Sequence, residues 1–195
     1  MRQHPIEKKV WSGLTLPVEQ VTMSKIIEPV LTSSVPFFLL DLCVPLCRVA
    51  QRERADKYSN SETTITVLHG DATDFGCPGL PAAGTVDLVT ISYSLVMIPD
   101  WNKAIQNAKR LLKPRTGMVA VCDFTLSPDQ TTLARQFWRR TFEQDHVYLD
   151  EAHLETLEKE FDAIETGRGY GTLPYTPPFL KAPYYYFIGK KGVAA

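Results

Sequence analysis

The sequence predicts an α/β fold with a doubly wound, mostly parallel sheet and an antiparallel pair of strands at its C-terminal edge. Residues 86–124 read as strand, helix and strand, with a polar loop after the first strand. Residues 36–70 contain two short apolar runs on either side of a helical segment, which is typical of buried parallel strands. Near the C-terminus, two strand-like segments flank a Gly- and Pro-rich stretch, which favours an antiparallel pair.

The size and charge of the chain limit its domain organisation and its partners. Its 195 residues with 44% hydrophobic content suit one sizeable core. We expect residues 1–35 to form an atypical N-terminal segment with a helix at 17–30, and residues 36–195 to form one domain. The net charge of -1 and the scattered basic residues give no attraction to nucleic acid, so we expect no nucleic-acid partner.

The first half of the domain is read from apolar runs and turn residues. The run FFLLD predicts a buried strand at 37–41, and Pro45 lies near the start of a helix predicted at 43–58. The segments that follow are a strand at 64–70, a loop rich in Gly and Pro at 74–84, and a strand at 86–92.

The second half contains the clearest helical pattern. Asp100 is expected to cap a helix that Lys113 and Pro114 end, with apolar residues spaced by three and four at Trp101, Ala104, Ile105, Ala108, Leu111 and Leu112. The remaining predicted elements are a strand at 117–124, a helix at 131–144, a helix opened by Asp150, and strands at 162–168 and 182–191.

Polar residues at the carboxyl ends of the predicted strands are the first candidates for a site. In an open α/β sheet, ligands bind beyond these ends, which here carry Asp41, Asp71 and the group Ser92, Tyr93 and Ser94. A carboxylate at Asp41 can accept hydrogen bonds from both hydroxyls of a ribose. Asp71 can accept from an adenine amine, while Ala72 offers a backbone N–H to a ring nitrogen. The alternative is that Asp41 caps the following helix and Asp71 closes a turn.

Four segments together carry a family resemblance. They are FLLDLCVPLCRVAQ, HGDATDF, VDLVTISYSLVMIPDW and LLKPRTGMVAVCDF, in this order. They resemble the later motifs of class I S-adenosylmethionine-dependent methyltransferases, over about residues 36–125, with a Rossmann-like fold. Two further segments, FWRRTFEQDHVYLDEAHLETLEKEF and KAPYYYFIGKK, resemble the methyltransferase half of betaine lipid synthases, which make diacylglyceryl-trimethylhomoserine.

The resemblance implies S-adenosylmethionine as cofactor and three successive methyl transfers to the amine of a diacylglyceryl-homoserine headgroup. The cofactor-binding candidates are Asp41, Leu42, Asp71, Ala72, Ser92 and Tyr93. Tyr93 is also the candidate wall of the reacting centre, because an aromatic face attracts a sulfonium or a quaternary ammonium. The alternative for Tyr93 is simple packing at a strand end.

The same resemblance implies that Arg139, Asp145 and His146 lie near the lipid headgroup. Arg139 would pair with the homoserine carboxylate, and His146 would act as a proton acceptor, making Tyr93 and His146 the catalytic candidates. The alternatives are a solvated Arg139–Glu143 pair on a helix surface and a structural role for His146. The aromatic residues Phe137, Trp138 and Phe142 are expected to pack in the core rather than to touch acyl chains.

The sequence departs from this family near its start. Gly13 is the only glycine among the first 69 residues, so no glycine-rich turn precedes Asp41 by the roughly 20 residues that this fold uses. We therefore expect the chain to lack its first central strand and to be truncated at its start. Three functions stay open: a betaine-lipid methyltransferase, a degenerate non-catalytic remnant that binds a partner, and a methyltransferase for another small molecule.

The cysteines and the hydropathy pattern bear on localisation. Cys43, Cys47, Cys77 and Cys122 suggest neither a disulfide framework nor a metal site, and we expect them to be small buried side chains. The longest apolar run, VPFFLLDLCV, is far shorter than the ~20 residues that span a bilayer. We expect an intracellular, cytoplasmic protein with peripheral contact at the endoplasmic reticulum membrane. A second catalytic domain or chain is an expected partner.

Overall fold

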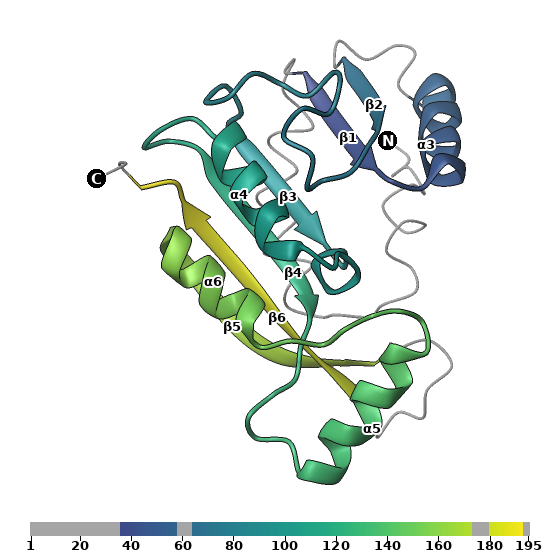
Figure 1. Cartoon of the computed structure of the whole chain (residues 1–195), viewed down its shortest axis with the longest axis vertical. Coiled ribbons are helices and arrows are strands. Elements are labelled where there is room, and N and C mark those ends of the chain that lie inside the picture. The colour runs from purple at the N-terminus through teal and green to yellow at the C-terminus, as the bar shows by residue number, and fades with distance from the viewer. Residues whose placement is uncertain (1–35, 58–63, 173–179, 193–195) are drawn as a thin grey trace, which may run out of the picture.

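The computed structural model describes residues 36–57, 64–172 and 180–192. The predicted helix at 17–30 lies outside these residues. Figure 1 shows strands and helices alternating along most of the chain, as predicted. The elements are β1 (Phe37–Asp41), α3 (Val44–Lys57), β2 (Ile65–His69), β3 (Leu88–Ser92), the short 3-10 helix η1 (Leu95–Met97), α4 (Trp101–Leu111), β4 (Met118–Phe124), α5 (Thr132–Glu143), α6 (Ala152–Glu160), β5 (Asp162–Thr172) and β6 (Lys181–Lys190).

The strands form two separate sheets. β1 pairs with β2 in parallel, and the second sheet has the order β3-β4-β6-β5. In that second sheet, β3 and β4 are parallel, whereas β6 is antiparallel to both β4 and β5. The predicted α/β sheet with an antiparallel C-terminal edge is thus confirmed. No strand among the described residues joins the two sheets, so the central strand expected in this fold is not found there.

The strands β1, β2, β3 and β4 point towards the same edge of the molecule (Figure 1). Asp41 lies beside His69 in the β1–β2 register, and Ser92 lies beside Cys122 in the β3–β4 register. The carboxyl ends that carry the predicted site residues therefore face one edge, which is where an α/β sheet binds its ligands.

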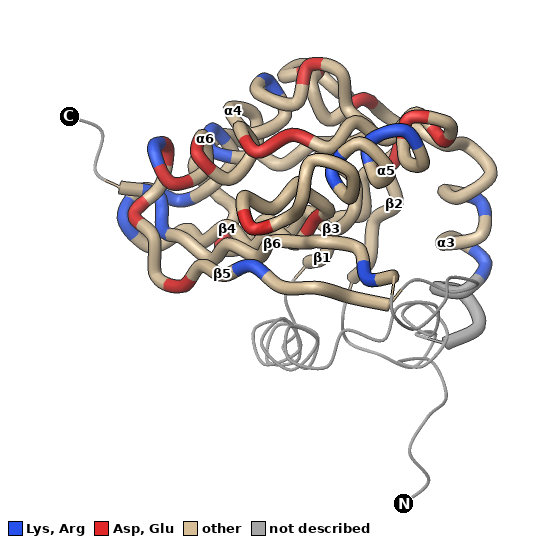
Figure 2. The backbone as a smooth tube through the Cα atoms, turned by 90° about the horizontal axis from the view of Figure 1, so that it is seen from below, with Lys and Arg blue, Asp and Glu red and all other residues tan. Residues whose placement is uncertain are grey.

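The main core lies between the four-stranded sheet and two helices. α4 and α6 cover the same face of this sheet (Figure 2). Ile105 of α4 and Leu157 of α6 are completely buried against Val121 and Phe187 of the central strands. Burying a side chain of this size contributes about 1.5–3 kcal/mol each, which explains why the apolar positions of α4 recur at three and four.

Two glycines of the edge strand β5 lie against tyrosine rings of β6. Gly167 and Gly169 lie opposite Tyr186 and Tyr184. A Cβ atom added at Gly167 would lie 2.5 Å from the Tyr186 ring, so the tyrosine rings occupy the space that a β5 side chain would fill. These glycines permit the close approach of the two tyrosine rings to the backbone of β5.

A second cluster surrounds α5. Trp138 and Phe142 are buried together with Val96, Leu126 and Leu149, which confirms the core role predicted for these two aromatic residues. Phe137 differs from the prediction, because its side chain is 45% exposed on the outer side of the helix. Its ring still touches Trp138, with the ring centroids 5.2 Å apart.

Two further local predictions were wrong in detail. Asp100 occupies the N-cap position of α4, but its carboxylate makes no cap hydrogen bond and pairs instead with Lys103 at 2.8 Å. Cys43 is exposed, because it lies in the turn between β1 and α3, whereas Cys47, Cys77 and Cys122 are buried as expected. All four are free thiols.

Among the described residues, the helices are too short or too polar to span a membrane.

Candidate functional site

The first candidate, Asp41, ends β1 with its side chain exposed. One carboxylate oxygen, Oδ1, accepts a hydrogen bond of 2.7 Å from the N–H of Cys43. The carbonyl of Asp41 accepts from the N–H of Gly70 at 3.1 Å, which ties the ends of β1 and β2 together. The carboxylate thus braces the turn into α3, as the alternative interpretation required, and still presents oxygen atoms to solvent.

Leu42 follows directly and is 66% exposed. Its carbonyl accepts a hydrogen bond of 3.1 Å from Nε2 of His69, the last residue of β2. The exposed apolar side chain beside Asp41 forms a surface on which a flat ring can rest.

Asp71 and Ala72 lie just beyond β2. Oδ1 of Asp71 accepts from both the N–H and the hydroxyl of Thr73, each at 2.8 Å, and these bonds lower the pKa of Asp71. The carbonyl of Ala72 accepts from Nδ2 of the buried Asn107 at 2.9 Å. No described residue accepts from the N–H of Ala72. Asp71 therefore closes a turn and remains ionised, while Ala72 is held with its N–H available.

Tyr93 has an unusual backbone at the end of β3. Its φ of 50° lies in the left-handed region, which is uncommon for a residue other than glycine. The N–H of Tyr93 donates to the carbonyl of Cys122 at 2.9 Å, and its ring centroid lies 5.0 Å from that of Phe124. Burial raises the pKa of the Tyr93 hydroxyl above its usual value, so it stays protonated at neutral pH. Strained residues of this kind concentrate at functional sites.

A residue that the sequence analysis missed, Asp123, holds this turn in place. Its side chain is completely buried in β4. Oδ2 accepts from the N–H groups of Ser94 at 3.0 Å, Leu95 at 2.8 Å and Val96 at 3.4 Å. Oδ1 accepts from the N–H of Phe124 at 2.8 Å. Asp123 thus accepts the hydrogen bonds of the backbone N–H groups immediately after Tyr93. The sequence signal that could have identified Asp123 was an acidic residue within an otherwise apolar strand.

The environment of Asp123 has opposing effects on the pKa of its carboxyl group. Burial raises the pKa of its carboxyl to about 7, although the four backbone N–H donors act to lower it. The group therefore titrates in the neutral range. Ser94 has a second anchor, since its hydroxyl donates to the carbonyl of Ser92 at 2.9 Å.

The expected headgroup residues lie at the end of α5 and in the turn after it. Arg139, Asp145 and His146 are all exposed, and His146 has a left-handed backbone with a φ of 58°. No hydrogen bond or ion pair between described residues joins any of them to Tyr93. The N–H of Asp145 donates to the carbonyl of Phe142 at 3.0 Å. The ring centroid of Phe142 lies 4.9 Å from that of Phe124, which lies 5.0 Å from that of Tyr93.

The alternative Arg139–Glu143 pair does not form among the described residues. The arginine that α5 uses structurally is Arg135, which donates to Glu151 at 2.6 Å and to the carbonyl of Ser127 at 2.9 Å. Arg135 fastens α5 to the segment before α6, and the side chain of Arg139 is left in solvent.

The sequence profile of the methyltransferase domain matches residues 33–163. The chain belongs to this methyltransferase family. The matched range contains β1 through β4 and every candidate site residue. The broad class implied by the four segments is therefore confirmed, whereas nothing in the match names betaine lipid synthases. Comparison with curated protein sequences finds no match.

Solved structures share the fold at low sequence identity. A putative methyltransferase from Bacillus halodurans is 15% identical with a TM-score of 0.61, and the alignment covers 81% of this chain and 84% of that one. A SAM-dependent methyltransferase from Methanosarcina mazei is 14% identical with a TM-score of 0.63, covering 87% and 88%. A phosphoethanolamine N-methyltransferase from Haemonchus contortus, in complex with S-adenosylhomocysteine, is 15% identical with a TM-score of 0.63, covering 92% and 54%. The predicted Rossmann-like fold agrees with all three.

Proposed function

We propose that this methyltransferase uses S-adenosylmethionine to methylate the amine of a diacylglyceryl-homoserine headgroup in betaine lipid synthesis. The observation that carries the methyl-transfer part is the strained Tyr93, fixed by Asp123 at the end of β3, which points to the same edge of the molecule as β1 and β2, the strands that Asp41 and Asp71 follow. The lipid part is supported by the resemblance of residues 137–161 and 181–191 to betaine lipid synthases.

The residues at this edge suit the cofactor. Asp41 is exposed and, among the described residues, only its Oδ1 is engaged, by Cys43, so its carboxylate is able to accept from the hydroxyls of a ribose. Ala72 has an N–H that no described residue occupies and a carbonyl anchored by Asn107, which suits a ring nitrogen of adenine. Leu42 and Ser92 would complete the contacts beside these two strand ends.

Methyl transfer requires little more from the protein than the correct positioning of the amine and the cofactor. S-adenosylmethionine supplies, when bound, a methyl group that its sulfonium already makes electrophilic. Tyr93 would form the wall beside the amine and exclude water, and its ring face favours a growing quaternary ammonium. Asp123 would keep Tyr93 in its strained conformation. His146 would accept the proton that the amine loses, and Asp145 would stand next to it.

The outer side of α5 supports a lipid substrate. Leu133 is 80% exposed and Phe137 is 45% exposed, one helical turn apart. Arg139 and Arg140 are exposed on the same helix. This combination of apolar and basic side chains suits peripheral contact with a membrane surface, from which Arg139 would reach the homoserine carboxylate.

Two other functions have observations in their favour. The separate β1–β2 sheet and the lack of glycine before Asp41, apart from Gly13, favour a non-catalytic remnant that associates with a partner. The structural neighbour from Haemonchus contortus was solved with phosphomonomethylethanolamine, so methylation of another small amine is the second alternative.

Two measurements separate these functions. Isothermal titration of the full chain with S-adenosylmethionine should give saturable heat, and its absence up to millimolar cofactor would exclude the enzyme. Transfer of a labelled methyl group should then occur to diacylglyceryl-homoserine in mixed micelles. Transfer to phosphoethanolamine but not to the lipid would replace the proposed substrate, and binding without any transfer would favour the remnant.

A further inference from the structure

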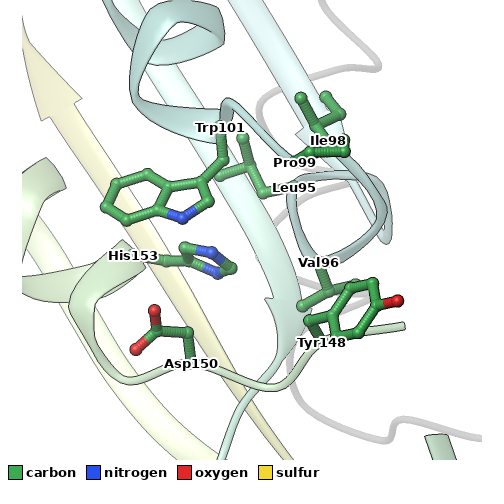
Figure 3. A pocket seen from close by; sticks show the side chains of 8 residues that line it. All are labelled: Leu95, Val96, Ile98, Pro99, Trp101, Tyr148, Asp150 and His153. Atoms are coloured by element: carbon green, nitrogen blue, oxygen red, sulfur yellow. The ribbon is translucent and has the colours of Figure 1, made fainter. Parts of the chain in front are cut away.

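A pocket lies on the helix-covered face of the four-stranded sheet, at the start of α4. Figure 3 shows it between Trp101, His153 and Asp150 on one side and Leu95, Val96 and Tyr148 on the other; Ile98 and Pro99 complete its lining. Its volume is about 350 Å³, part of which is open to solvent. That space is sufficient for a small organic molecule.

His153 is the buried polar group of this pocket. Its side chain is 1% exposed, and its Nδ1 atom has no hydrogen-bond partner among the described residues. An unsatisfied buried nitrogen destabilises the protein, so a ligand that bonds to it removes this penalty. Burial also lowers the pKa of His153, which leaves the imidazole neutral at pH 7 and able to present a lone pair at Nδ1.

The remaining lining favours a cation. Asp150 is the only charged residue among the eight, and its Oδ1 already accepts from the N–H of Ala152 at 2.9 Å. Trp101 and Tyr148 contribute aromatic rings, and the Trp101 ring meets His153 edge to face with centroids 4.6 Å apart. One carboxylate, two aromatic rings and a neutral acceptor together select a positively charged group that carries an N–H.

This pocket is separate from the candidate methyltransferase site. Successive residues of β4 point to opposite faces of the sheet. Tyr93 packs with Cys122 and Tyr184 on one face, whereas Leu95 of the pocket packs with Val121 and Tyr185 on the other. The pocket does not depend on the function proposed above.

We propose that this pocket binds a small primary or secondary organic ammonium ion. One N–H of the ligand donates to Nδ1 of His153, the carboxylate of Asp150 balances the charge, and the rings of Trp101 and Tyr148 enclose the alkyl groups. A quaternary ammonium lacks the N–H and leaves Nδ1 unsatisfied, so it binds more weakly.

The test titrates the full chain with dimethylammonium chloride and follows the His153 ring signals by NMR with ¹³C-labelled histidine. We expect a saturable shift with dimethylammonium and at least about tenfold weaker binding of tetramethylammonium, equivalent to about 1.4 kcal/mol. Sodium chloride at the same concentration controls for ionic strength. Two results would overturn the proposal. One is the lack of a saturable shift up to 100 mM ligand, roughly the weakest affinity that a specific site would show. The other is equal binding of the two ammonium ions.

Three variants locate the binding. Asp150→Asn keeps the oxygen that accepts from Ala152 and removes the charge, so it should weaken dimethylammonium binding severalfold without changing the fold. In His153→Asn, an amide oxygen near the position of Nδ1 should retain binding, whereas His153→Gln should lose it; binding in these two is followed by the heat of titration. Unchanged affinity in Asp150→Asn would contradict the proposal even if the histidine variants fail to fold.

Discussion

The two sheets of this protein differ sharply in how they are buried. In β4 of the four-stranded sheet, Val119, Ala120 and Val121 have no exposed surface. In β1 of the two-stranded sheet, Phe38 is 38% exposed and Leu39 is 36% exposed. Apolar burial is the main source of folding stability, so the larger sheet is the stable part of the described fold. The candidate site uses both, because Asp41 and Asp71 follow the small sheet and Tyr93 follows the large one.

The difference should appear most strongly in core substitutions. Phe187→Ala removes a completely buried ring from β6 and should lower the free energy of unfolding by about 3–5 kcal/mol. Leu39→Ala in β1 should cost less, about 1–2 kcal/mol, because Leu39 is 36% exposed to solvent. Urea unfolding of both variants checks this. Equal losses would mean that the two sheets are equally well packed.

Removing Asp123 should produce the next largest effect. Asp123→Ala leaves the N–H groups of Ser94, Leu95, Val96 and Phe124 without their acceptor. We expect a loss on the order of 1–3 kcal/mol in the free energy of unfolding at pH 6. The turn after Tyr93 should also exchange its amide hydrogens faster, and unchanged exchange there would show that Asp123 does not hold the turn.

Asp123 should also make stability depend on pH. Its folded-state pKa of about 7 lies above the value of roughly 3.9 for an unfolded aspartate. Between these values the folded protein binds more protons than the unfolded chain, so the contribution of this group is full below about pH 4 and declines as the pH rises to about 7. Unfolding measured from pH 4 to pH 8 should therefore show a decline that is smaller in Asp123→Ala. A decline of equal size in the variant would assign it to other groups.

The smaller sheet should matter for the cofactor more than for stability. Asp41→Ala should weaken S-adenosylmethionine binding at least tenfold, about 1.4 kcal/mol, because the ribose hydroxyls lose their acceptor. The circular dichroism spectrum should stay the same, since Asp41 is exposed. Asp74→Ala is a matched control, because Asp74 is also an exposed acid beyond a strand of the small sheet, and its Oδ1 accepts a hydrogen bond from the N–H of Gly76. Equal affinity in the two variants would remove Asp41 from the site.

Local sequence patterns were sufficient for most of the elements. The spacing of apolar residues at 101–112 predicted α4, and the Gly- and Pro-rich loop before residue 86 was correctly read as lacking a helix. The antiparallel pairing of β5 and β6 also followed from the sequence, because two strand patterns flank a turn-forming stretch. These features depend on periodicity and on turn residues, which neighbouring positions determine.

The positions of buried polar groups depended on the tertiary structure. Three backbone N–H groups that donate to Asp123 lie 27 to 29 residues earlier in the chain, and His153 faces residues 95–101 across the pocket, so no local pattern distinguishes these two groups. The sequence by itself determined the strands, the helices and the acids at the strand ends. Only the tertiary structure decided that a different acid, Asp123, is buried, which backbone groups it holds and where its pKa lies, because burial and hydrogen bonding depend on residues distant in the chain.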